Sequence, residues 1–414
     1  MKKSFFVDIS LLKTNSDFRK VFIARAISIL GLGMLAVAVP IQVHQLTGST
    51  FHVGMAMALD GIGMFIGLLL GGVLADKYDR RRLILFARSV CGLGFIGLTI
   101  NSLLPEPSLA ALYVLSVWDG FFGALGVTAL MAATPHIVGR ENLMQAGALG
   151  MLAVRTGSVI SPAIGGAVIA AVGISWNYAI AAIMTCITLI PLYKLPAMKP
   201  KFIEDHNPIQ SLIGGFKFLF SNKIVLSVMA MGTLVTLTGA IRVLFPTMVM
   251  DDFAKNAFLT GLIFSMVPLG AMLAALTSGW ANQVKRPGVV MSFTSLAVFC
   301  CVILIGLAPN YYFVLASLVV YGYLSSICGL IQYTLVQANT PDEYLGRVNS
   351  LWTAQDVSGE SGGAVAVGAL GKLLTPMVTI VFFGSAALIT GLLIWLLSYR
   401  VVKGVKLDEP EMAN

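Results

Sequence analysis

The strongest constraint on this chain is a succession of long apolar segments, separated by short breaks rich in Gly, Pro and polar residues. A helix needs about 20 mainly apolar residues to cross a bilayer, and twelve segments reach that length. Only 11% of the 414 residues are charged, against about 25% in soluble domains. The sequence therefore predicts an all-α integral membrane protein with twelve transmembrane helices, at about residues 19–44, 52–75, 83–101, 109–132, 143–172, 176–194, 224–250, 257–281, 288–308, 311–337, 348–371 and 377–400.

The Lys and Arg residues are distributed unevenly between the two sets of loops. Loops after even-numbered segments carry most of them, whereas loops after odd-numbered segments hold only Lys255 and Lys372. Cytoplasmic loops are the positive ones, so we expect both termini in the cytoplasm, the N-terminal one as a retained tail with a short interfacial helix. The formal net charge of +8 then reflects topology, and nucleic acid is not needed as a partner.

Motifs of enzymes and metal sites are not visible. The five cysteines lie inside apolar segments without CxxC or Cys/His spacing, and no HExxH, GxSxG or GxxxxGK[ST] pattern occurs. We therefore expect no catalytic residues, no metal, no cofactor and no ATP-driven motor. A membrane enzyme or receptor would need a catalytic constellation or a sizeable soluble domain, and the sequence offers neither.

The chain repeats itself at half its length. The stretch TPHIVGRENL at 134–143 is echoed by TPDEYLGRVNSL at 340–351, so that Arg140 and Arg347 are 207 positions apart. Six spans preserve orientation, which makes this a parallel repeat with a site near the midplane between two six-helix halves. We predict an N-terminal half at 1–194 with a cytoplasmic tail, a cytoplasmic linker loop at 195–222, and a C-terminal half at 223–414 with a second tail.

The loop after the second segment reads GVLADKYDRR at 72–81. It resembles the GxxxD[RK]xGR[RK] signature of the major facilitator superfamily, with Asp79 in place of the Gly. The matching residues, which the resemblance assigns to a gating loop, are Gly72, Asp76, Lys77, Arg80 and Arg81. Gly72 would let helices approach, and Asp76 would cap a neighbouring helix or pair with Arg80 or Arg81 in one gate state. The alternative is an ordinary positive cytoplasmic loop.

The fifth segment contains LAVRTGSVISPAIGG at 152–166. Part of it resembles the GxxxGPxxGG signature of antiporter-type facilitators, with Ser in place of the first Gly of GP; the matching residues are Gly157, Ser161, Pro162, Gly165 and Gly166. Small residues every four positions let helices pack closely, and the Pro kinks the span. The resemblance favours export over import, although ordinary helix packing would use the same residues.

Longer stretches, among them WDGFFG, GRENLMQAGA, GSVISP and LWTAQDVSG, resemble the catechol siderophore exporters of this superfamily. The resemblance implies export of enterobactin from cytoplasm to periplasm by proton antiport across a bacterial inner membrane. It implies the proton gradient as energy source, and siderophore, protons, membrane lipid and an outer-membrane efflux channel as partners. A proton-coupled multidrug exporter of broad specificity is the alternative, because a large apolar, Gly-rich interior suits it equally.

Charged residues at membrane depth are costly and are functional candidates. The candidates for proton coupling are Asp60, Asp119, Asp356 and Glu360, because buried or closely paired carboxyl groups can hold a proton near neutral pH. A fixed salt bridge, for instance between Asp119 and Arg155, is the competing interpretation. Arg155 is thus either the partner of a buried carboxylate or a contact for an oxygen-rich ligand.

Arginine and aromatic side chains suit a catechol ligand, because guanidinium groups stack on aromatic rings and donate to oxygens. In the facilitator arrangement spans 1, 4, 7 and 10 line the cavity, span 2 packs against span 11 and span 5 against span 8. The candidate substrate contacts are Arg155, Arg242, Trp118, Phe122 and Tyr333. Aromatic residues in membrane spans also serve as packing or interfacial anchors, which is the alternative for the last three.

Overall fold

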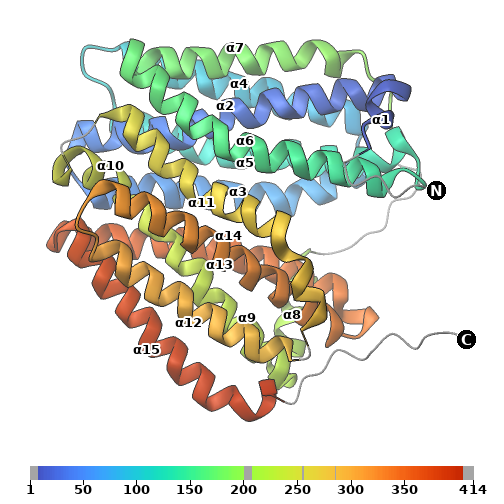
Figure 1. The fold of residues 1–414 in the computed structure, drawn as a ribbon. Helices are drawn as coiled ribbons and strands as arrows, with labels where there is room; N and C mark the ends of the chain where they lie inside the picture. Colours follow the sequence, from blue (N-terminus) through green and yellow to red (C-terminus); the bar gives the residue numbers. More distant parts are fainter. Residues whose placement is uncertain (1–7, 200–207, 254–255, 285, 404–414) are drawn as a thin grey trace, which may run out of the picture. The chain divides into compact units, whose positions relative to one another are not determined.

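The structure, a computed structural model, describes residues 8–199, 208–253, 256–284 and 286–403. Every regular element in this part of the chain is a helix (Figure 1). Eleven of the helices are long and apolar enough to cross a membrane. The predicted tails before residue 8 and after residue 403, and residues 200–207 of the predicted linker, lie outside the described residues.

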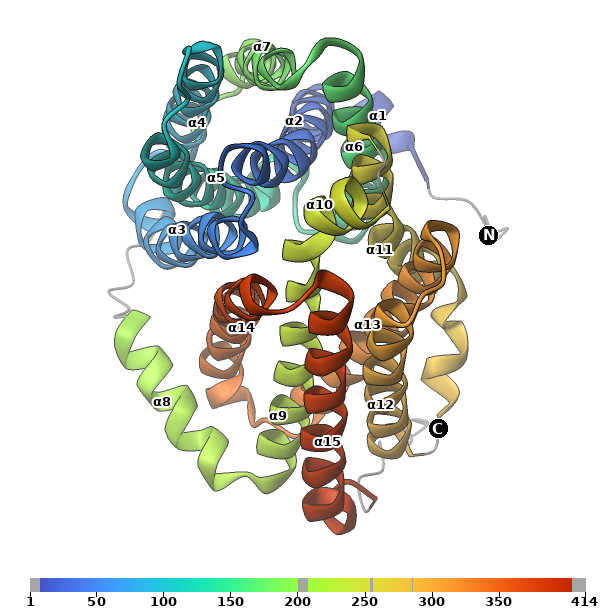
Figure 2. The same cartoon turned by 90° about the vertical axis from the view of Figure 1, so that its left-hand side faces the viewer.

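The chain forms two compact units, of which the first spans Met1–His206 and Phe245–Ser265. Its helices pack as a bundle in which α2 contacts both α6 and α7, and α5 contacts both α3 and α4 (Figure 2). These helices are α1 Ser10–Thr14, α2 Ser16–Thr47, α3 Thr50–Lys77, α4 Arg80–Leu103, α5 Leu109–Val138, α6 Leu143–Val172, α7 Ile174–Tyr193, α10 Phe245–Thr247, the π-helical η2 Met248–Asp252 and the start of α11 Ala257–Thr277.

The second unit spans Asn207–Leu244 and Met266–Asn414. In it α12 packs between α13 and α15, and α14 packs against α9 (Figure 1). Its helices are α8 Pro208–Ser221, α9 Lys223–Thr238, the 3₁₀ segment η1 Gly239–Leu244, the rest of α11, the 3₁₀ segment η3 Ser278–Gln283, α12 Pro287–Gly306, α13 Tyr311–Ala338, α14 Asp342–Leu373 and α15 Pro376–Lys403. The predicted spans thus form within a few residues of their expected bounds.

The helix α14 corresponds to the eleventh predicted span. It is 32 residues long, but it is not among the eleven helices that are long and apolar enough to cross a membrane, because it is rich in polar residues, Asp356 and Glu360 among them. Charged residues inside a membrane span are tolerated where they face protein or a water-filled cavity. The polar residues of α14 therefore indicate that this helix faces protein or a water-filled cavity and carries functional residues.

The internal repeat is visible in how the helices start. Asn15 caps α2 by accepting a hydrogen bond from the Phe18 N–H at 2.9 Å, and Asn222, 207 positions later, caps α9 by accepting from the Ile224 N–H at 3.0 Å. The amide Nδ2 of each cap also donates to a distant backbone carbonyl, at 2.8 and 3.1 Å. Matching caps with matching long-range bonds agree with a parallel repeat of the fold.

Close backbone contacts repeat in the same way. In the first unit Gly120 of α5 faces the backbone of α3, where an added Cβ would lie 2.8 Å from the Met64 nitrogen. In the second unit Gly270 of α11 faces α13, where an added Cβ would lie 2.7 Å from the Tyr323 nitrogen. Helices can approach this closely only where no side chain intervenes.

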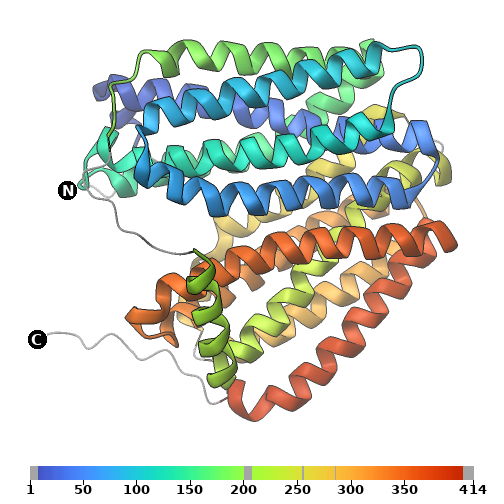
Figure 3. The same cartoon turned by 180° about the vertical axis from the view of Figure 1, so that it is seen from behind.

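The region predicted as a linker loop contains the helix α8. The helix α8 lies against α14 (Figure 3). The Phe218 ring stacks on Tyr344 with 4.8 Å between centroids, and Gly214 and Gly215 lie close to Arg347. Side chains at helical spacing on the opposite face, Ile213, Phe216 and Phe220, are exposed. The helix was not predicted because it is short, begins at a Pro and follows a charged stretch. The short N-terminal helix that was predicted is present as α1.

Candidate functional site

A polar cluster in the second unit surrounds a break in the seventh span. The span begins as α9 and changes at Gly239 into the 3₁₀ segment η1, which carries Arg242. A 3₁₀ stretch within a longer helix often marks a functional hinge, and discontinuous helices form the substrate sites of many transporters. The break places Arg242 in an ion pair with Glu360 of α14, each side chain remaining more than a third exposed.

Three further residues, Thr238, Tyr321 and Asp356, lie near this ion pair. Together with Arg242 and Glu360 they form what we call the polar cluster. The Thr238 and Tyr321 hydroxyls lie 3.0 Å apart. Asp356, one turn before Glu360, accepts a hydrogen bond from Trp352 Nε1 at 2.9 Å and one from the Thr236 hydroxyl at 3.3 Å. The cluster offers a guanidinium, hydroxyls and two carboxyl groups, which suits a ligand rich in oxygen atoms and the binding of a proton.

The predicted residue Tyr333 contacts Trp352, which lies one turn before Asp356 on α14. Their rings meet edge to face with centroids 5.7 Å apart, and the Trp352 indole holds Asp356. Tyr333 is 53% exposed, and its role as a substrate contact stays a prediction. The structure therefore brings together three of the predicted residues, namely Arg242, Asp356 and Glu360, whereas Tyr333 contacts Trp352, two turns before Glu360 on α14.

In the first unit, Asp119 of α5 faces α4. Its Oδ1 accepts a weak hydrogen bond from the Cys91 thiol at 3.4 Å, and the buried Arg88 lies one turn before that cysteine. The neighbouring Trp118 donates through Nε1 to the Val90 carbonyl at 2.7 Å, and its ring lies 4.8 Å from that of Phe122. Trp118 is thus a packing residue of the α4–α5 interface as well as a candidate contact.

The salt bridge between Asp119 and Arg155 that the sequence allowed is not formed. Arg155 is partly buried on α6, and within the part of the chain that the structure describes it makes no ion pair or hydrogen bond. The physical reason is that α5 packs chiefly against α3 and α4, which directs Asp119 towards Arg88 and Cys91. Asp60 lies on α3, where its backbone carbonyl faces Gly120; its proposed approach to Asp356 and Glu360 stays a prediction.

The small-residue stripe of α6 packs along α2. Gly157 faces the Ile29 side chain, the Ser161 hydroxyl lies against Gly33, and a Cβ added at Gly165 would lie 2.9 Å from the Met34 Cα. The Ser161 hydroxyl is buried without a partner among the described residues. The stripe thus makes α2 and α6 fit closely, as the predicted interface of small residues requires.

The other edge of α6 packs against α11. A Cβ added at Gly166 would lie 2.7 Å from the Gly261 Cα, and Gly261 in turn faces the Pro162 carbonyl. This is the predicted contact between the fifth and eighth spans. Phe245 and Phe264 add an edge-to-face ring contact with centroids 5.1 Å apart. These contacts explain why residues 245–265 group with the first unit.

The gating loop has a different cap from the one predicted. Asp79, and not Asp76, caps α4, because Asp79 directly precedes the helix and accepts from the Arg82 N–H at 3.2 Å. Arg80 Nε donates to the Ala75 carbonyl at 3.3 Å. Asp76 is exposed and, among the described residues, makes no ion pair with either arginine of the motif.

The remaining motif residues lie at the surface of the loop. Gly72 and Lys77 are exposed, and nothing lies within 4 Å of a Cβ added at Gly72. Arg81 donates to the Tyr193 carbonyl and its guanidinium lies 5.2 Å from the Tyr193 ring centroid. The arginines of the motif thus bind the start of α4 to the end of α3 and to the end of α7. The gating role of the loop stays a prediction.

Two features of the site were missed in the sequence. Arg88 reads as an extension of the basic loop at 80–82, although it lies two turns inside α4. His44 at the end of α2 lies 3.2 Å from Asp251 and 3.3 Å from the Thr247 hydroxyl. His44 and Asp251 are 207 positions apart, which is the period of the repeat. The repeat therefore identifies them as equivalent positions of the two halves, although it does not predict their contact.

The fold and the polar cluster define a multi-pass membrane transporter. Residues 21–359 and 235–413 match the Major Facilitator Superfamily, and the chain belongs to this family. Enterobactin exporter EntS of Escherichia coli O1:K1 / APEC is 49% identical over 395 residues, which cover 95% of each chain. Enterobactin exporter EntS of Shigella boydii serotype 18 (strain CDC 3083-94 / BS512) matches to the same extent.

Solved structures agree on the fold. The nucleoside transporter NupG is similar with a TM-score of 0.71 at 12% identity, covering 94% of this chain and 100% of the other. A POT family transporter in complex with 5-aminolevulinic acid is similar with a TM-score of 0.76 at 14% identity, covering 97% and 98%. At such identities the likeness concerns the fold alone.

Proposed function

We propose that this chain exports enterobactin, or a closely related catechol siderophore, from cytoplasm to periplasm across a bacterial inner membrane in exchange for protons. The observation that carries the proposal is the 49% identity to enterobactin exporters over 95% of both chains. The substrate crosses unchanged, without a cofactor, and the proton gradient supplies the energy. Two six-helix halves, 1–194 and 223–414, alternate in access, with both termini and the linker at 195–222 in the cytoplasm.

The polar cluster supports a specific coupling scheme. While Glu360 is ionised, its carboxylate forms an ion pair with the guanidinium of Arg242 and engages donors of that group. A proton on Glu360 weakens that pair and frees the donors of Arg242, which match the paired oxygens of a catechol. The proton then binds to Glu360, and the substrate binds to Arg242, the other partner of the same ion pair. Asp356 lies one turn away on the same helix face, and Asp119 is the corresponding candidate in the first unit.

Secretion tests the proposal directly. A strain that makes enterobactin but lacks its own exporter is supplied with this gene or with empty vector, and catechol siderophore in the medium is measured by chromatography. We expect the gene to restore secretion. Equal secretion with and without the gene, together with altered resistance to dyes or antibiotics, would contradict the proposal and indicate a multidrug exporter.

Single substitutions test the coupling residues. Asp60→Asn, Asp119→Asn, Asp356→Asn and Glu360→Gln are each compared with the parent protein for proton-driven export. We expect at least one of them, Glu360→Gln first, to abolish the dependence on the proton gradient. Unchanged export in all four would exclude these carboxyl groups as the coupling site.

A further inference from the structure

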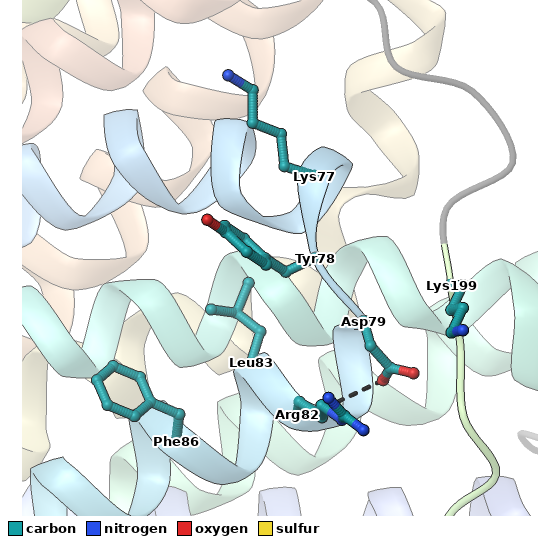
Figure 4. Close-up of a pocket in the computed structure, with 7 residues that line it drawn as sticks. All are labelled: Lys77, Tyr78, Asp79, Arg82, Leu83, Phe86 and Lys199. Atoms are coloured by element: carbon teal, nitrogen blue, oxygen red, sulfur yellow. Dashed lines mark hydrogen bonds between the residues drawn. The ribbon is translucent and has the colours of Figure 1, made fainter.

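A pocket of about 500 Å³ lies at the turn between α3 and α4 of the first unit. Its walls are formed by Lys77, Tyr78, Asp79, Arg82, Leu83, Phe86 and Lys199. Figure 4 shows that the lining is two-sided: Asp79, Arg82 and Lys199 gather at one side, and Leu83 and Phe86 lie at the other. We propose that this pocket binds the phosphate headgroup of an anionic phospholipid.

The charge of the lining favours an anion. Three of the seven residues are cations and one is a carboxylate. That carboxylate, Asp79, is already engaged as the cap of α4, where it accepts from the Arg82 backbone N–H at 3.2 Å. The guanidinium of Arg82 can bind two phosphate oxygens at once, whereas Lys77 and Lys199 act as point charges. The excess of positive charge favours an anionic lipid over a zwitterionic one.

The apolar side of the pocket favours a lipid over free phosphate. Tyr78 is 59% exposed and Phe86 is 55% exposed, so both rings are accessible to the acyl chains of a bound lipid, and a Tyr ring suits the boundary between headgroups and acyl chains. From Phe86 an exposed apolar stripe continues along α4 through Leu93 and Ile100, at seven-residue spacing. Residues seven apart share one face of a helix. An acyl chain can therefore follow this stripe while its headgroup stays in the pocket.

The position of the pocket fits the membrane. Basic residues concentrate at this end of the first unit, with four cations and two carboxylates between residues 76 and 82. Such basic sites at the cytoplasmic ends of spans attract the anionic lipids of the inner leaflet. Lipid bound here would contact Lys77 of the gating loop directly.

The test is native mass spectrometry of the purified full-length protein. Delipidated protein is titrated with phosphatidylglycerol and, separately, with phosphatidylcholine of the same acyl chains. We expect phosphatidylglycerol to bind more tightly, and Arg82→Gln/Lys199→Gln to weaken its binding by about 30-fold. The matched control, Lys13→Gln/Arg140→Gln, removes one exposed Lys and one exposed Arg of the same unit outside the pocket, and should leave binding unchanged.

Two further arms separate lipid from phosphate. Phe86→Ala should weaken phosphatidylglycerol binding, because it removes the apolar wall, and an excess of inorganic phosphate should not displace the lipid. Equal binding of both lipids, or an unchanged affinity in the Arg82→Gln/Lys199→Gln protein, would overturn the proposal. Complete displacement by inorganic phosphate would also overturn it, because the pocket would then be a phosphate site.

Discussion

At the scale of single residues, the ion pair between Arg242 and Glu360 is the central observation. Its side chains are 39% and 37% exposed, so the pair is accessible to a substrate and to protons. Exposed pairs contribute at most about 1 kcal/mol to stability. The two charges inside membrane spans are therefore better explained by function than by cohesion.

Glu360→Gln should separate transport from stability. Gln cannot take up and release a proton, so proton-driven export should fall by about tenfold or more, the effect of losing one charged partner. Thermal unfolding in detergent should change little, because the pair is exposed. Export is measured as siderophore in the medium, and Glu106→Gln, at an exposed loop position, is the control.

The double variant Arg242→Ala/Glu360→Gln decides between the two roles of the pair. If the pair only holds α14 against the seventh span, removing both charges should restore export, because no unpaired charge remains. We expect export to stay low, because the double variant lacks the guanidinium that we propose as a substrate contact. Restored export would contradict the coupling scheme.

Residue positions were easier to predict than residue partners. Arg242, Asp356 and Glu360 stand out in the sequence because charges are rare in apolar segments, and the structure places all three in one cluster. Their pairing depends on the turn at Gly239, which no apolar pattern reveals. Arg88 was missed because an arginine two turns from a basic loop reads as a residue that extends to the surface.

At the scale of elements, the packing of α6 depends on glycines that face two different helices. Gly157 and Gly165 face α2, and Gly166 faces Gly261 of α11. Because a Cβ at Gly166 would lie 2.6 Å from the Ala257 carbonyl oxygen, the two helices have no room for a larger residue. This contact joins the fifth and eighth spans at close range.

Gly166→Ala should therefore destabilise the protein. Overpacking of a close contact costs about 1–3 kcal/mol, so the thermal unfolding midpoint should fall. The matched control is Gly147→Ala in the same helix, where nothing lies within 4 Å of the added Cβ; it should stabilise the helix by about 0.5–1 kcal/mol. Equal midpoints for the two variants would show that the α6–α11 contact is not close.

Spans were predictable as elements, whereas their interruptions were not. Residues 223–252 read as one apolar run, yet the helix changes form at Gly239 and again at Met248. Packing decides this: His44 of α2 contacts Thr247 and Asp251, and α14 contacts η1. Such tertiary contacts override local preference, so the sequence alone predicts a continuous helix there.

At the scale of the whole molecule, the parallel repeat is the feature that sequence and structure share. The pairs Asn15 with Asn222 and Arg140 with Arg347 are both 207 positions apart, and the two asparagines cap corresponding helices. Two copies of six spans keep one orientation, which agrees with both termini on one side of the membrane. From the distribution of Lys and Arg we expect that side to be the cytoplasm.

Reporter fusions test this topology. Green fluorescent protein joined after Asn414 should fluoresce, and alkaline phosphatase at the same position should be inactive, because the former folds in the cytoplasm and the latter needs the oxidising periplasm. A fusion in the short loop at 104–108, which we expect to face the periplasm, is the control and should give the reverse result. Active phosphatase at the C-terminus would contradict the proposed orientation.

Transport into everted inner-membrane vesicles tests whether this protein exports enterobactin by proton antiport. In these vesicles the cytoplasmic face is outside and respiration acidifies the interior, so an exporter driven by proton antiport moves substrate inward. We expect vesicles containing this protein to accumulate enterobactin, and a protonophore to abolish the accumulation. Accumulation no greater than in vesicles without the protein, or accumulation unaffected by the protonophore, would contradict it.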